Sequence, residues 1–177
     1  MAILQFEDRV PKIGENSNVC ASAEVIGNVS IGNNCYIGFG ARIRGDYGEI
    51  IIGDGAIIED NCVIHARPDE QCKIGKRVTV GHGSILHNCT IYDSAVIGMG
   101  SIISDYAVVG EWAVVGEGAV VPNNKEIPAG KVAVGVPAKV IADTSEEYKT
   151  LWDSYKDLYA ELAQRYKIGL KRVDKGN

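Results

Sequence analysis

The chain has 177 residues, which suits one domain of ordinary size, and its 46% hydrophobic content is enough for a continuous core. The net charge of -5 comes with scattered lysines and arginines, so nucleic acid is not expected as a partner. No apolar run approaches the roughly 20 residues that span a bilayer and the N-terminus has no signal-peptide pattern, so we expect no membrane partner and a cytoplasmic location.

An aliphatic residue, often followed by a small or polar one, recurs every six positions through most of the chain. About eighteen such hexads can be counted. Neither the 3.6-residue period of a helix nor the alternation of a two-sided strand fits this spacing. The uninterrupted runs cover residues 13–43, 52–64, 74–86 and 91–121.

The pattern resembles the hexapeptide repeat of left-handed parallel β-helices, in which three hexads make one triangular coil. Eighteen hexads then predict an all-β solenoid of about six coils over residues 1–142. The aliphatic residues point into the prism, and nearby glycine, asparagine and aspartate suit the tight corners. The five cysteines are odd in number and form no C-x-x-C pair, so we expect reduced core residues rather than disulfides.

The repeat is irregular at three places. Nine residues instead of six separate Ile43 from Ile52, ten separate Ile64 from Ile74, and five separate Leu86 from Ile91. Insertions leave a solenoid as surface loops, often on its binding face. All three irregularities lie around the histidines.

The chain has only three histidines, and counting hexads predicts where they stand. His65 and His87 occupy the second place of hexads that are three apart, so they should lie one above the other at the ~4.8 Å spacing of paired strands. His82 belongs to the preceding hexad and faces another corner. If three prisms pack about a threefold axis, His82 of one subunit reaches the stacked pair of its neighbour.

Three imidazoles with one open position are the ligand set of a catalytic zinc, so the pattern predicts a homotrimer with metal between subunits. The alternative is that the histidines are structural or surface residues. The same counting puts Arg44 beneath the pair, with Asp46 two residues on as its ion-pair partner within the chain or across the interface. Glu59 lies one coil below His82, where it exchanges protons with water or is a plain surface carboxylate.

The period changes near Ala142. Thr144 and Glu147 form a possible capping box, and apolar residues then follow helical spacing, so we expect a helix over 143–168 packed on the prism and a frayed tail over 169–177. The helix either screens strand edges or contributes a catalytic tyrosine.

Three segments, Arg44-Gly-Asp46, Glu59 to His65 and Val80 to His87, resemble the γ-class carbonic anhydrases. The resemblance implies that His65 and His87 of one subunit and His82 of its neighbour bind zinc, iron or cobalt. It implies that Arg44 and Asp46 form an interface pair, with Arg44 near bicarbonate. Metal-bound hydroxide then attacks carbon dioxide, bicarbonate departs and water is deprotonated.

Two residues depart from the family pattern. Glu59 stands where well-known members carry a glutamine, and Tyr47 replaces a glutamate used in proton transfer. The loop after His65 is too short for the family's acidic proton-shuttle loop. Members without that loop often place a tyrosine from the C-terminal helix near the metal, and Tyr159 is our match.

Three other functions remain open. The Arg-Gly-Asp-Tyr-Gly segment looks like the subgroup associated with phenylacetate and carnitine metabolism, for which hydrolysis of coenzyme A thioesters has been proposed. A hexapeptide acyltransferase would use one histidine as a base and need no metal. A trimeric scaffold with a structural metal is compatible with every motif.

Overall fold

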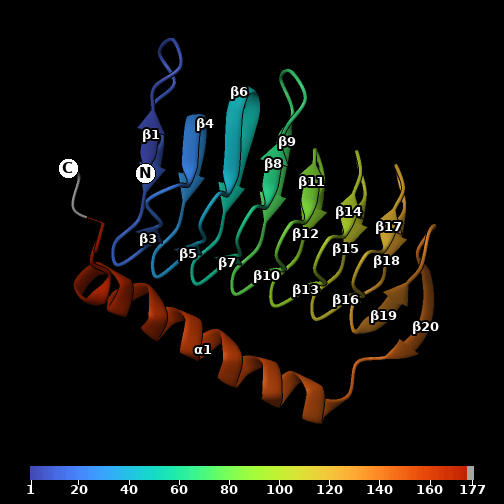
Figure 1. The fold of residues 1–177 in the computed structure, drawn as a ribbon. Coiled ribbons are helices and arrows are strands. Elements are labelled where there is room, and N and C mark those ends of the chain that lie inside the picture. Colours follow the sequence, from blue (N-terminus) through green and yellow to red (C-terminus); the bar gives the residue numbers. More distant parts are fainter. Residues whose placement is uncertain (175–177) are drawn as a thin grey trace.

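The computed structural model describes residues 1–174, which form a left-handed parallel β-helix followed by one long helix (Figure 1). Each coil of the prism contributes a strand segment to each of three faces, and the segments of neighbouring coils pair in parallel. The five cysteines are free and buried, as expected.

Two faces join into one sheet because β4 and β6 run through the corner between them. We call the face that holds β8 and β11 the histidine face, because these two strands carry His65 and His87. Its strands are β1 (Ala2–Leu4), the first parts of β4 (Glu24–Ile31) and β6 (Arg42–Ile52), β8 (Val63–His65), β11 (Ile85–His87), β14 (Ile102–Ile103) and β17 (Val120–Val121). The adjoining face holds β2 (Lys12–Ile13), the second parts of β4 and β6, β9 (Gln71–Ile74), β12 (Thr90–Ile91), β15 (Val108–Val109) and β18 (Glu126–Ile127).

The third face, here called the helix face, forms a separate sheet whose first strands contact the C-terminal helix. It ends in β20, which pairs antiparallel with β19. Its strands are β3 (Asn18–Val19), β5 (Tyr36–Ile37), β7 (Ile57–Ile58), β10 (Thr79–Val80), β13 (Val96–Ile97), β16 (Val114–Val115), β19 (Lys131–Val134) and β20 (Lys139–Asp143).

The prism has about seven coils, one more than the hexad count predicts. The six-residue spacing in fact continues beyond Val121 to Ile127 and Ala133, both of which are buried in the core. Ala133 is too small to stand out as an aliphatic repeat position in the sequence. With the hexad of β1 at the other end of the prism, where Ile3 pairs with Val25, the count therefore missed three hexads, which make one coil.

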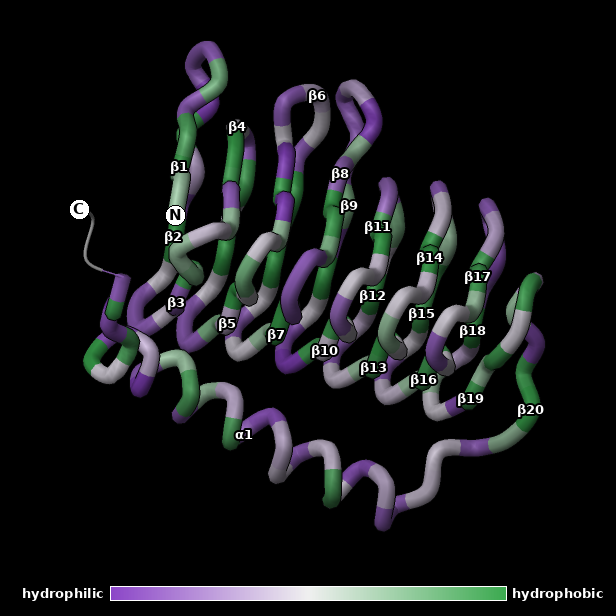
Figure 2. Tube along the Cα trace, in the orientation of Figure 1, coloured by the Kyte–Doolittle hydropathy of each residue, from purple (hydrophilic) through white to green (hydrophobic). Residues whose placement is uncertain are grey.

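The heads of the hexads fill the prism, and Figure 2 shows the resulting hydrophobic segments along the strands, with hydrophilic segments in the projecting loops. Ile43, Ile64 and Leu86 stack on consecutive coils of the histidine face and are fully buried. Burying a side chain of this size contributes about 1.5–3 kcal/mol before conformational entropy is counted. The loops after β1 and β8 and the bend within β6 project beyond the other turns (Figure 1).

The C-terminal helix α1 (Glu146–Gly169) begins three residues later than expected. Ser145, not Thr144, is its N-cap and accepts a hydrogen bond from the backbone N–H of Tyr148. The Thr144 hydroxyl instead donates to the carbonyl of Trp112 on the prism. Among the described residues, no helix is both long and apolar enough to cross a membrane.

Helix α1 runs back along the prism from the last coils toward the first (Figure 1). Its Ala163 packs against Cys20, Tyr36 and Ile57 of the helix face. The buried Lys156 donates from Nζ to the carbonyl of Ser94 at 2.8 Å. Residues 170–174 have no regular structure, and residues 175–177 of the expected tail lie outside the described part of the chain.

Candidate metal centre

His65 and His87 stand one above the other on adjacent coils, as the hexad count predicts. They are direct partners in the pairing of β8 with β11, and Arg44 pairs with His65 on the coil below. Nδ1 of His65 lies 3.2 Å from Nε2 of His87. The repeat therefore brings two imidazole nitrogens together on the histidine face.

Each of the two rings is held from behind by a carboxylate. Nε2 of His65 lies 2.9 Å from Oδ1 of Asp46, and Nδ1 of His87 lies 2.5 Å from Oδ1 of Asp105. A carboxylate accepts a hydrogen bond and cannot donate one, so each ring keeps its proton on the nitrogen that faces its aspartate. The two nitrogens that face each other then both present lone pairs.

Two lone pairs at this separation can share a proton, as a hydrogen bond between the rings, or a metal ion. Two nitrogens bound to zinc at 2.0–2.1 Å in tetrahedral geometry lie roughly 3.3–3.4 Å apart, close to the 3.2 Å found here. Histidines that bind metals usually donate their other N–H to a carboxylate or carbonyl, as both rings do here. The donor set fits zinc. Within the described part of one chain, no group of three or more such side chains is arranged to hold a metal, so a site with three protein ligands would require a residue from another chain.

The structure places His82 at another corner, where it lies against Glu59. Nε2 of His82 is 3.1 Å from Oε2 of Glu59, and Nδ1 accepts from the backbone N–H of Asp60 at 3.2 Å. The ring is 47% exposed, so it has room to turn toward a neighbouring subunit. The single chain does not direct it there.

Tyr159 of α1 reaches the same corner and donates from its hydroxyl to Oε1 of Glu59 at 2.5 Å. Oε2 of Glu59 also accepts from the backbone N–H of His82 at 3.1 Å. Burial, followed by the hydrogen bond to Glu59, raises the pKa of Tyr159 well above its usual value. The phenol therefore holds its proton at neutral pH, and Glu59 is fixed between helix and prism.

The two aspartates behind the paired histidines are both held in the charged form. Burial by itself would raise the pKa of Asp46, but the hydrogen bonds from His65 and Arg44 outweigh it and the net shift is downward. The hydrogen bond from Arg67 is the largest cause of the lowered pKa of Asp105, against the opposing effect of burial. Asp46 pairs with Arg44 inside the same chain.

Asp105 and Arg67 are site residues that the sequence reading missed. Hexad counting puts Ser104, not Asp105, one coil above His87, and Asp105 reaches back from the following turn. Arg67 lies in the short loop after His65, which carried no signal beyond its length. Nη2 of Arg67 donates to Oδ2 of Asp105 at 2.6 Å.

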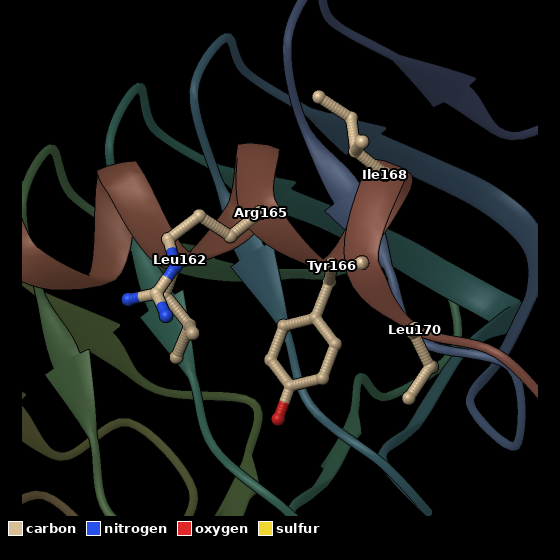
Figure 3. Close-up of a pocket in the computed structure, with 6 residues that line it drawn as sticks. Leu162, Arg165, Tyr166, Ile168 and Leu170 are labelled. Atoms are coloured by element: carbon tan, nitrogen blue, oxygen red, sulfur yellow. The ribbon is translucent and has the colours of Figure 1, made fainter.

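Among the hollows formed by the described residues, two that lie away from the paired histidines bear on function. One, about 490 Å³, lies between α1 and the helix face and includes Glu59 and His82 at its lining, with Val96, Val114 and Trp152 as apolar walls. The other, about 530 Å³, is formed by the last turns of α1 and contains none of the histidines (Figure 3). Its lining is Leu162, Arg165, Tyr166, Ile168, Gly169 and Leu170.

Comparison with known proteins finds a matching repeat family and a relative that is similar over nearly the whole chain. The family described as bacterial transferase hexapeptide (six repeats) matches residues 11–45. The carnitine operon protein CaiE of Proteus sp. is 35% identical over 170 residues, covering 96% of this chain and 86% of that protein.

Two solved structures are also similar. A Bacillus cereus protein assigned as an acetyltransferase, the product of the BC4754 gene, is 38% identical with a TM-score of 0.92, covering 94% of this chain and 96% of the other. A hexapeptide transferase family protein from Anaplasma phagocytophilum is 33% identical with a TM-score of 0.89, covering 93% and 98%.

Proposed function

The chain belongs to the hexapeptide-repeat family that includes the carnitine operon protein CaiE, and we propose that within this family it is a homotrimeric, zinc-dependent enzyme that hydrates carbon dioxide to bicarbonate. The observation that carries the proposal is the facing pair of ring nitrogens on His65 and His87, each ring backed by an aspartate. An acyltransferase base needs one such histidine, whereas two converging lone pairs suit a metal.

His65 and His87 would hold the zinc from one subunit, with His82 as the ligand from a neighbour. Zinc in such a site lowers the pKa of a coordinated water to about 7 and so supplies a nucleophile at neutral pH.

The surface around the paired histidines supports a trimer. Val63, Ile85 and Ile102 are strand partners on three consecutive coils of the histidine face, and their side chains are 38–42% exposed. Three aligned aliphatic side chains in water favour association, because covering them removes apolar surface. We assign this stripe to the contact between subunits, which would bring a neighbour's His82 to the pair.

Glu59 and Arg44 have roles in the proposed reaction. Tyr159 fixes Oε1 of Glu59, which leaves Oε2 beside His82 to accept and release protons. Arg44 lies on the coil below His65, and its half-exposed guanidinium supplies positive charge for bicarbonate. Removing either charge should lower turnover more than metal content.

The test is stopped-flow carbon dioxide hydration by the trimer, purified without oxygen and reloaded separately with zinc and with iron. We expect activity that rises with metal occupancy. The His82→Ala variant should lose metal and activity and form a weaker trimer, whereas Asp93→Asn, at a turn whose carboxylate caps the Lys76 N–H, is the matched control. A fully metallated but inactive trimer would exclude the proposal.

Acyl transfer is the second candidate, favoured by the names of the relatives and by the hollow beside His82. There His82 would act as the base on an acceptor once its half-exposed ring turns away from Glu59, with the acyl group along the apolar wall of Val96 and Val114. Acetyl-coenzyme A is the probe. Thiol release that requires an added amine or alcohol indicates transfer, and release without an acceptor indicates thioester hydrolysis. No thiol release from metal-free protein would exclude this candidate.

A further inference from the structure

The two paired histidines have matching supports. Behind His65 lies Asp46, which pairs with Arg44, and behind His87 lies Asp105, which pairs with Arg67. The second aspartate is the more buried, because the side chain of Asp105 is 10% exposed and that of Asp46 is 17% exposed. The same Arg–Asp–His arrangement therefore occurs twice, once on each side of the facing nitrogens.

We propose that Asp105, held by Arg67, is a positioning residue that keeps the His87 proton on Nδ1 and so leaves Nε2 free to bind the metal; this inference rests on the proposed function. The 2.5 Å contact from Nδ1 to Oδ1 fixes both the tautomer and the angle of the ring. Arg67 occupies Oδ2 at 2.6 Å, so the carboxylate cannot rotate away without losing a charge-assisted hydrogen bond.

Arg67 also links the two histidines. It follows His65 by two residues, and its backbone N–H donates to Oδ1 of Asn88, the residue after His87, at 3.2 Å. The side chain of Asn88 is tied in turn to Glu70 in the same loop. These hydrogen bonds join the loop after His65 to the end of β11, which carries His87. The two rings are therefore held relative to each other by this loop as well as by the pairing of β8 with β11.

The tautomer can be read directly by ¹⁵N NMR of metal-free trimer labelled only at histidine, because the chain has three histidines. We expect wild-type His87 to be protonated at Nδ1. Asp105→Ala should shift the proton to Nε2, and Asp105→Asn, which keeps an acceptor oxygen, should restore much of the Nδ1–H form. Wild-type His87 protonated mainly at Nε2 would overturn the inference.

Zinc affinity, measured by competition with a chelator, is the second readout. Asp105→Ala should weaken binding by about 10- to 100-fold, Arg67→Ala should weaken it less, and Asp93→Asn should leave it unchanged. Circular dichroism and sedimentation check that each variant remains a folded trimer. Wild-type affinity in a folded Asp105→Ala trimer refutes the role. If the wild type binds no zinc, the proposed function fails, while the tautomer measurement still decides what Asp105 does.

Discussion

The Tyr159→Phe substitution tests what the hydrogen bond from Tyr159 to Glu59 contributes to the stability of the fold and to the proposed proton transfer. The substitution removes one hydroxyl and keeps the ring, which packs edge-on against Tyr36 with centroids 5.3 Å apart. The hydrogen bond from Tyr159 to Glu59 joins residues 100 positions apart and ties α1 to the prism. The variant therefore tests one contact without creating a large cavity.

The expected loss is about 1.5–3 kcal/mol, the usual contribution of a hydrogen bond to a charged group. The Glu59 side chain is only 11% exposed, so water replaces the lost phenol poorly and the upper half of that range is expected. For a chain of this size the melting temperature should fall by roughly 3–12 °C. The raised pKa of Tyr159 means that this contribution is fully present below about pH 10, the pKa of an unfolded tyrosine, and is lost only as pH rises above it.

Urea unfolding followed by circular dichroism gives the free-energy difference between variant and wild type. Tyr155→Phe is the matched control, because Tyr155 lies on the exposed side of the same helix and its hydroxyl has no hydrogen-bond partner among the described residues. A loss below about 0.5 kcal/mol for Tyr159→Phe, equal to the control, would refute the reasoning. If zinc affinity is unchanged while turnover falls, Tyr159 acts through Glu59 on proton transfer.

Three further predictions concern stability. Desolvation is the main cause of the lowered pKa of Lys156, about 8, so between pH 8 and 10.5 the unfolded lysine holds a proton that the folded one has released. Wild-type stability should therefore rise with pH relative to Lys156→Met over that window, as urea titrations at several pH values will show; parallel curves would contradict it. Leu86→Ala should cost about 2–5 kcal/mol in the same assay, since Leu86 is fully buried in the prism, and a cost under 1 kcal/mol would argue against that packing. Ser145→Ala should cost about 1 kcal/mol by thermal unfolding because it removes the N-cap of α1, whereas an unchanged melting temperature would mean that the cap is dispensable.

Much of the site was predictable because a six-residue repeat fixes register. His65 over His87, and Arg44 beneath them, follow from counting hexads, since a loop insertion bulges outward and leaves the coils aligned. The proximity of Glu59 to His82 follows from the same count. In a solenoid, distance along the chain translates directly into position on a coil.

The sequence by itself determined the prism, the stacking of two histidines and the presence of a helix after about residue 142. Only the tertiary structure decided that Asp105 supports His87 and that Tyr159 donates its hydrogen bond to Glu59. The repeat specifies backbone register, but not how far a side chain reaches from a turn or where a helix with its own period lies on the prism. Those outcomes depend on packing between residues as much as 100 positions apart, which a local pattern does not encode.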